Sequence, residues 1–216
     1  MEALPFKRSD AFAVQSAMHN LSMPSPKTPP PIYQLKVTLI GIEPPIWRRI
    51  QVPSTILLRS LHDVIQIAVG WTDSHSHEFE DDGKSQDDPK LDNFDETKVS
   101  VGAVLKTVGD SVIYLYDFGD NWRHRVMLSK ILLTDETSAM PTCIGGERRC
   151  PPEDVGGVNG YDELMEAIFD PDPRKSYEEF RSWTGDRYHP DEFDLKIVND
   201  QISRMGRQIR HSDEVA

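Results

Sequence analysis

The feature that most constrains the fold is a pair of strand-like runs joined by a short polar turn. An apolar run, residues 112–116, leads towards Gly119-Asp120-Asn121, and an alternating run, residues 122–132, leaves it. Gly, Asp and Asn tolerate the backbone angles that tight hairpin turns need. The sequence therefore predicts a β-hairpin.

The alternation in the second run assigns side chains to the two faces of the strand, because successive residues point in opposite directions. One face carries Trp122, His124, Val126 and Leu128, and the other carries Arg123, Arg125 and Ser129. His124 therefore points the same way as the apolar residues. A polar ring on a core face is either hydrogen-bonded for structure or held there for chemistry. We expect the structural role first, with Asp117 or Asp120 orienting the ring.

The rest of the chain predicts further strands and helices around the hairpin. Alternation and apolar stripes place strands at 33–39, 46–52 and 75–79, and helices at 54–69, within 99–108, and at 161–169, 172–183 and 194–208. Ser54 or Thr55 is the expected cap of the first of these helices, Asn159 is the expected cap of the helix at 161–169, and the Gly- and Pro-rich residues 140–160 are expected to form a loop. Strands come first and helices last. This order favours an α+β fold, an antiparallel sheet with helices packed mainly on one face in a single compact domain.

Composition divides the chain into an arm and one globular unit. Residues 1–31 end in a proline-rich run and predict a disordered arm, and residues 32–210 predict a single domain. No apolar run approaches the ~20 residues that a membrane span needs, and no signal peptide is apparent. Two cysteines fit a reducing compartment. We therefore expect a cytoplasmic protein.

The net charge of the chain indicates which kinds of macromolecule it could bind. The net charge is −12, and much of it lies in the acidic stretch at 80–96, which is typical of a solvated loop. DNA binding draws most of its affinity from Lys and Arg on phosphates, and the chain has no run of five basic residues. Duplex DNA is therefore not an expected partner, and another protein is.

Three histidines raise the possibility of a metal site. His75 and His77 share one face of a predicted strand, and His124 on a neighbouring strand is a candidate third ligand. Three imidazoles with a water would form a catalytic zinc arrangement. The alternative is that His75 and His77 bond the backbone for structure. The expected cofactor is none, with zinc as the alternative.

Other polar groups offer weaker signals. Six residues separate Cys143 from Cys150, which is wrong for a zinc knuckle, and buried cysteine mostly behaves as a small apolar residue. The run 145–149, Gly-Gly-Glu-Arg-Arg, could cradle an anion but lacks a phosphate-loop ending. Carboxylates at 117, 120, 153 and 154 could hold magnesium or could stabilise turns and pair with arginines. The candidate catalytic residues are Asp117, Asp120 and His124. The candidate ligand-binding residues are Arg48, Trp122, Arg148, Glu153 and Asp154.

Four ordered segments carry a resemblance to a known family. They are Ile46-Trp47-Arg48-Arg49; Leu61-His62 with Gly70-Trp71 and His75-x-His77-x-Phe79; Tyr116-Asp117-Phe118-Gly119-Asp120-x-Trp122-x-His124; and Cys143-x-Gly145-Gly146-x-Arg148-x-Cys150-Pro151-Pro152-Glu153-Asp154-x-Gly156-Gly157. Together they resemble the plasmid pRiA4b open-reading-frame-three-like family over residues 33 to 205. The resemblance implies a compact α+β domain and no particular activity. Some members carry a transposon-resolvase label, but the serine that it would need, Ser9, lies in the predicted arm.

These observations favour a non-catalytic cytoplasmic interaction module associated with plasmids or mobile elements. One alternative is a metal-dependent, hydrolase-like enzyme that uses His75, His77, His124 and Asp120. Another is an accessory of transposon or site-specific DNA recombination. The sequence leaves open whether the protein is an enzyme.

Overall fold

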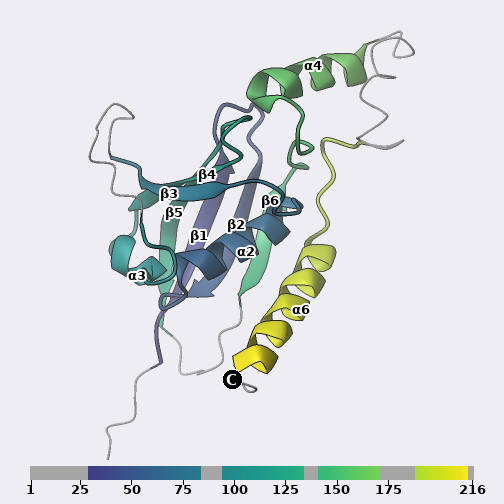
Figure 1. The fold of residues 1–216 in the computed structure, drawn as a ribbon. Coiled ribbons are helices and arrows are strands. Elements are labelled where there is room, and N and C mark those ends of the chain that lie inside the picture. The colour runs from purple at the N-terminus through teal and green to yellow at the C-terminus, as the bar shows by residue number, and fades with distance from the viewer. Residues whose placement is uncertain (1–28, 84–93, 134–140, 171–187, 214–216) are drawn as a thin grey trace, which may run out of the picture.

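Six antiparallel strands form one sheet, which organises the molecule (Figure 1). The computed structural model describes residues 29–83, 94–133, 141–170 and 188–213. The strand order in the sheet is β3-β4-β5-β1-β2-β6. The strands are β1 (Ile32–Leu39), β2 (Trp47–Pro53), β3 (His77–Asp81), β4 (Ser111–Tyr116), β5 (Trp122–Leu132) and β6 (Thr142–Glu147).

The predicted hairpin is formed by β4 and β5 in the middle of this sheet. Tyr116 pairs with Trp122 and Tyr114 pairs with His124 across the two strands. Asp117 and Asn121, at the two ends of the turn, both have φ 56°. Asp and Asn tolerate this left-handed conformation better than most residues, which explains why the turn has these residues.

Helices cover one face of the sheet, as the predicted α+β fold requires. In Figure 1, α2 (Leu58–Val69) lies across the front of the strands, and α6 (Leu195–Asp213) packs against β6 and α2. Two further helices are α3 (Val101–Val104) and α4 (Gly157–Phe169). The core between the sheet and α2 is apolar and includes Leu35, Val37, Ile50, Val52, Leu61, Ile65, Phe79, Val126 and Leu128. The fold class is therefore confirmed.

Two predicted helix caps are wrong. Helix α2 begins at Leu58, after Ser54 and Thr55, and no side chain caps it. Its first amides are satisfied by another segment instead: Leu58 donates to the carbonyl of Val99, and Arg59 donates to the carbonyl of Glu96. Helix α4 begins at Gly157, so that Asn159 lies inside it. In both cases tertiary contacts or glycine conformation replace the expected side-chain cap.

The edge strand β6 was not predicted, because its Gly-rich sequence is typical of a loop. It pairs with β2, and Arg48 lies opposite Gly146. A Cβ atom at Gly146 would lie 2.8 Å from both Arg48 Cδ and the Phe193 ring. Glycine is therefore required here so that these two side chains can lie against the strand.

Some predictions lie outside the described residues. They are residues 1–28 of the predicted arm (1–31), the helix at 172–183, and residues 84–93 of the acidic stretch. Across the described parts of the chain, no helix is both long enough and apolar enough to cross a membrane.

Candidate functional site

Polar groups gather around the segment 71–77, which connects α2 to β3. Among the residues that the structure describes, five non-glycine residues have positive φ, and three of them are aspartates: Asp73, Asp117 and Asp154. Each of these three has a carboxylate within 4 Å of a histidine ring nitrogen. Strained backbone of this kind concentrates at functional sites, which directs attention to the histidines.

The first half of this segment is anchored by Glu153, which lies in the loop after β6. One Glu153 carboxylate oxygen accepts hydrogen bonds from the amide and the hydroxyl of Thr72, at 3.0 and 2.7 Å. The other accepts the phenol proton of Tyr116 at 2.6 Å. The Tyr116 oxygen in turn accepts the amide of Ser74. Burial, together with the Glu153 carboxylate, raises the pKa of Tyr116, so the phenol keeps its proton. Glu153 therefore holds the segment in place.

His62 belongs to a closed ring of hydrogen bonds that joins α2, β4 and the segment 71–77. The amide of Asp73 donates to Gln66 Oε1 at 3.1 Å, which leaves Gln66 Nε2 to donate to the Tyr114 oxygen at 2.8 Å. Tyr114 then donates its single proton to His62 Nδ1 at 2.8 Å. His62 Nε2 donates to Asp73 Oδ1 at 3.0 Å, which closes the ring.

These hydrogen bonds determine which nitrogen of His62 carries the proton. The Tyr114 oxygen accepts from Gln66, so the one hydroxyl proton of Tyr114 is donated to His62 Nδ1. Nδ1 accepts, so the proton of the neutral imidazole lies on Nε2. Burial and then the neighbouring His77 lower the pKa of His62, in agreement with a neutral ring. Burial also raises the pKa of Tyr114, which keeps the donor protonated. Both nitrogens of His62 are occupied.

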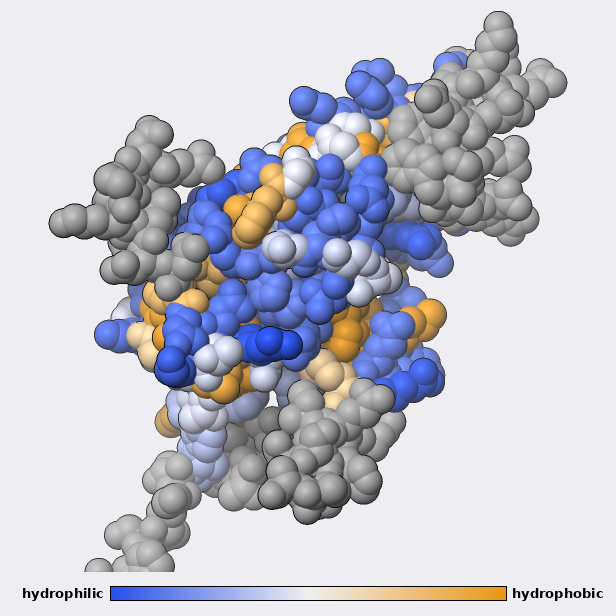
Figure 2. Space-filling model, in the orientation of Figure 1, coloured by the Kyte–Doolittle hydropathy of each residue, from blue (hydrophilic) through white to orange (hydrophobic). Residues whose placement is uncertain are grey.

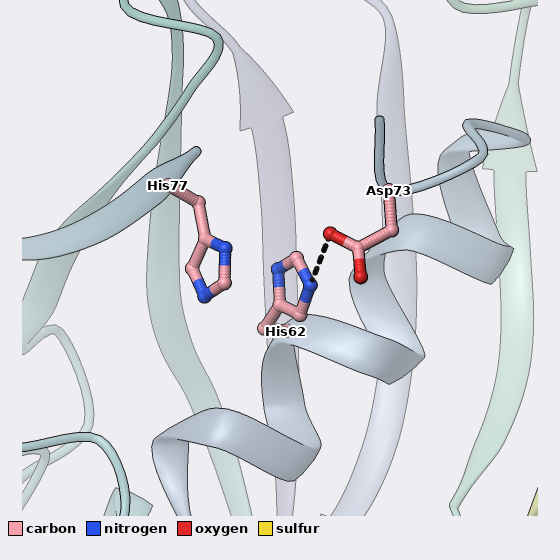
Figure 3. A group of neighbouring side chains, drawn as sticks. All are labelled: His62, Asp73 and His77. Carbon is pink, nitrogen blue, oxygen red and sulfur yellow. Dashed lines mark hydrogen bonds and ion pairs between the residues drawn. The ribbon is translucent and has the colours of Figure 1, made fainter. Parts of the chain in front are cut away.

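His77 stacks on His62, as Figure 3 shows. The ring centroids are 3.5 Å apart and the planes differ by 7°. His77 Nε2 also lies 2.9 Å from a carboxylate oxygen of Glu96. Asp73, His62 and His77 together offer atoms close enough to hold a metal ion. An imidazole-bound metal lies in the plane of its ring, however, and two parallel planes 3.5 Å apart share no such position. This group is therefore a closed hydrogen-bonding network.

His75 forms a second and more open group. Its Nδ1 lies 3.6 Å from Asp117 Oδ2, and its Nε2 lies 3.3 Å from Asp154 Oδ1. The side chain of Asp154 is 73% exposed, that of His75 28% and that of Asp117 11%. His75 Nε2 has no hydrogen bond of acceptable geometry. The three residues offer ligand atoms that all lie within 4.8 Å of one another.

The hairpin turn positions Asp117 for this group. Asp117 Oδ1 accepts the amide of Gly119 at 2.9 Å, which fixes the carboxylate. Its other oxygen is the one that faces His75. Asp120 is used differently, because its carboxylate accepts the amide of Gly156 at 3.1 Å. Of the two hairpin carboxylates, Asp117 is the one that reaches the histidine.

His124 lies apart from both groups and is 1% exposed. Its ring lies nearly perpendicular to that of Trp71, with the ring centroids 5.3 Å apart. Neither ring nitrogen has a side-chain partner among the described residues, so the expected orientation by Asp117 or Asp120 is wrong, and the polar groups that act on the ring are backbone groups of Tyr114 and Trp122. Burial lowers the pKa of His124 to about 4, which keeps the ring neutral. The structure thus separates the three histidines that the sequence grouped: His75 and His77 join different clusters, and His124 joins neither.

The remaining candidate residues have structural contacts. Arg48 is 3% exposed and donates to the carbonyls of Ala68, Trp47 and Glu147. Its oxygen partners are thus backbone carbonyls, and its guanidinium is committed to them. Arg148 donates to the carbonyl of Pro44, and Trp122 is buried in the core. Of the five candidate ligand-binding residues, only Asp154 is both exposed and beside a histidine.

The cysteines and the Gly-Gly run also have structural positions. Cys143 and Cys150 are free and buried. Burial raises the pKa of both thiols, which disfavours the reactive thiolate. Gly145 and Gly146 lie in β6 and pair with β2. They therefore do not form an anion-binding loop.

Sequence reasoning named only His77 from this network and grouped it with other histidines. The members that it missed are Gln66, His62, Asp73, Glu96 and Tyr114. His62 and Tyr114 are 52 positions apart in the chain and meet only because α2 packs on β4. The one local signal was His62 itself, a polar residue next to the apolar stripe of a predicted helix.

Comparisons with known proteins place this chain in a family. A family model described as plasmid pRiA4b ORF-3-like protein matches residues 31–197. The chain is 41% identical over 159 residues to the uncharacterized protein y4hQ of Sinorhizobium fredii, an alignment that covers 71% of this chain and 81% of that protein. The crystal structure of MM3350, a protein of unknown function from Methanosarcina mazei Go1, matches with a TM-score of 0.69 and 39% identity. That match covers 78% of this chain and 98% of MM3350.

Proposed function

The chain belongs to the plasmid pRiA4b ORF-3-like family, and from the geometry of its own residues we propose that it binds a divalent metal ion through His75, Asp117 and Asp154. One observation carries the proposal. An imidazole and two carboxylates converge to within 4.8 Å, and the imidazole nitrogen facing Asp154 has no hydrogen bond of acceptable geometry. Histidine nitrogen and carboxylate oxygen together suit Zn²⁺ or Mn²⁺.

The arrangement would leave part of the metal's coordination sphere open. Three protein ligands with a water in the remaining position are typical of catalytic zinc sites. Asp154 is 73% exposed, so solvent reaches this side of the group. A bound ion here would lower the pKa of its water and supply a nucleophile for hydrolysis. Metal-dependent hydrolysis is therefore the activity that this group would support.

The neighbouring His62 network is a poorer metal site for physical reasons. A metal on His62 would have to displace either Tyr114 or Asp73 from the ring nitrogens. Removing one partner from a buried hydrogen-bonded ring leaves other groups unsatisfied, at a cost of about 1–3 kcal/mol each. Binding at His75 breaks no such ring.

Zn²⁺ or Mn²⁺ is expected to raise the melting temperature of the wild-type protein. Binding to the folded state alone stabilises it by about 2.7 kcal/mol at a free concentration 100 times the Kd. For a domain of this size, that corresponds to a rise of roughly 5–10 °C. Thermal unfolding with and without each metal measures this rise.

Asp154→Asn is expected to remove most of the rise while leaving the metal-free melting temperature nearly unchanged, because the side chain is largely exposed. Asp191→Asn is the matched control, since Asp191 is 87% exposed and lies outside the group. It is expected to keep the full rise. An equal rise in wild type and in Asp154→Asn would contradict the proposal.

A second candidate is the non-catalytic interaction module. It is supported by the way the other reactive groups are used: Glu153 and Asp120 hold backbone amides, and the pKa of both thiols is raised by burial. Assays of the metal-loaded protein with phosphate-ester, carboxylic-ester and amide substrates distinguish the two candidates. Turnover that is lost in Asp154→Asn supports the hydrolase, and metal binding without turnover supports the module.

A further inference from the structure

A pocket lies between the end of α2, the segment 149–153 and the start of α6. Its volume is about 360 Å³. Figure 2 shows hydrophobic side chains in the recess between α2 and α6, with hydrophilic residues around them. A concave site of this size, lined by apolar groups with few polar ones, is the usual form of a small-molecule site.

One part of the pocket lining is apolar and another part is charged. Trp71, Pro151, Phe193, Ile197 and Val198 are among the lining residues. The indole N–H of Trp71 donates to the carbonyl of Pro151 at 2.8 Å. The walls therefore favour an apolar body.

The charged side chains of the lining favour a cation. Three are acids, Glu153, Glu192 and Asp194, and two are arginines, Arg48 and Arg149. Arg48 is buried against the Phe193 ring and bonded to carbonyls, so its guanidinium is not available. Arg149 lies 3.3 Å from Glu192. Glu192 is thus paired with Arg149, whereas the hydrogen bonds of Glu153 and Asp194 come from neutral donors, which leave their negative charges in place.

The backbone adds to this preference. The lining includes the last residues of α2, from Ile67 to Gly70, and the carboxyl end of a helix carries partial negative charge. Arg48 donates to one carbonyl there, that of Ala68, and so offsets part of this charge. The amino end of α6 also borders the pocket, with the opposite sign. There Asp194 accepts the amide of Ile197 at 2.9 Å, which offsets that positive end.

We propose that this pocket binds a small organic monocation with an apolar body, such as an arylalkyl amine. The apolar walls would hold the body, and the acids with the end of α2 would hold the ammonium group. The pocket is separate from the metal group, because its lining includes none of His75, Asp117 and Asp154.

Phenethylamine is the probe, and 2-phenylethanol and 3-phenylpropionate are its neutral and anionic counterparts. Titrations of the ¹⁵N-labelled full-length protein are followed through the amides of Gly70, Trp71 and Ile197 and the indole N–H of Trp71. Phenethylamine is expected to shift these signals with a Kd of about 1 mM or tighter, a modest affinity for a ligand of this size. The alcohol is expected to bind about tenfold more weakly, and the carboxylate more weakly still.

Opposite charges at one position test the electrostatic part. Ile197 is 56% exposed at the pocket wall, so substitutions there keep the fold. Ile197→Lys is expected to weaken amine binding about tenfold relative to Ile197→Glu, since both lose the same apolar contact. Val108→Lys, at an exposed residue outside the lining, is expected to bind as wild type does. Equal binding of all three probes, tighter binding of the carboxylate, no pocket shifts at about 10 mM amine, or equal affinity of the two Ile197 variants would overturn the proposal.

Discussion

Replacing Arg48 with methionine is expected to lower the free energy of unfolding by about 3–5 kcal/mol. The guanidinium donates at 2.7 Å to the carbonyl of Ala68 at the end of α2, and at 2.8 and 2.9 Å to the carbonyls of Trp47 and Glu147 in strands β2 and β6. It also lies 4.3 Å from the centroid of the Phe193 ring. Methionine fills similar space but donates to none of these three carbonyls. Urea unfolding measures the change.

Two variants test the mechanism behind this loss. Arg48→Lys keeps the charge but not the planar fork that reaches several carbonyls, and is expected to recover less than half of the loss. Arg49→Met, on the opposite face of the same strand, is expected to cost about 1 kcal/mol or less, because Arg49 is only partly buried. A cost below about 1 kcal/mol for Arg48→Met would mean that burying the charge cancels the three hydrogen bonds.

His124 is expected to make the protein sensitive to acid. Its pKa is lowered from 6.5 to about 4 by burial, so between these values the unfolded chain binds a proton that the folded protein does not. Stability from this residue is therefore complete above pH 6.5 and is lost as the pH falls towards 4. Each unit of pKa difference corresponds to ~1.4 kcal/mol, which gives about 3 kcal/mol in total.

His124→Leu removes the titrating group without breaking a side-chain hydrogen bond, since neither ring nitrogen has a side-chain partner. At pH 7.5 its unfolding free energy is expected to lie within about 1.5 kcal/mol of wild type. Between pH 6.5 and 4 the variant is expected to lose about 3 kcal/mol less than wild type does. His189→Gln, at an exposed position, is the control and keeps the wild-type slope. Parallel pH profiles for wild type and His124→Leu would show that His124 is not the acid-sensitive group.

Local periodicity was sufficient to predict most of the fold. Alternation placed Trp122, His124 and Val126 on the buried face of β5, and all three are buried there. Strand β6 was missed because Gly145 and Gly146 are typical of loops. The reason for glycine at position 146 is a tertiary contact. Arg48 and Phe193 approach the strand so closely that a Cβ atom at Gly146 would collide with them.

The candidate site was only partly predictable, because spacing along a strand does not say what lies opposite. His75 and His77 are two residues apart and were expected to act together. His75 precedes β3 and faces the hairpin turn at Asp117, whereas His77 begins β3 and stacks on His62 of α2. Asp117 and Asp154 were named from the sequence for their carboxylates. Their convergence on His75 depends on the hairpin turn and the loop after β6 lying side by side, which no local pattern records.

X-ray absorption at the zinc edge of the zinc-loaded protein distinguishes the His75 group from the His62 network, because it counts imidazole ligands. We expect one bound ion per chain with a single imidazole and otherwise oxygen ligands, at about 2.0–2.2 Å. We also expect this spectrum to be unchanged in His77→Ala and lost in His75→Ala. Two imidazoles on the metal, or a site that survives His75→Ala and disappears in His77→Ala, would place the ion in the His62 network and show that His75, Asp117 and Asp154 do not bind it.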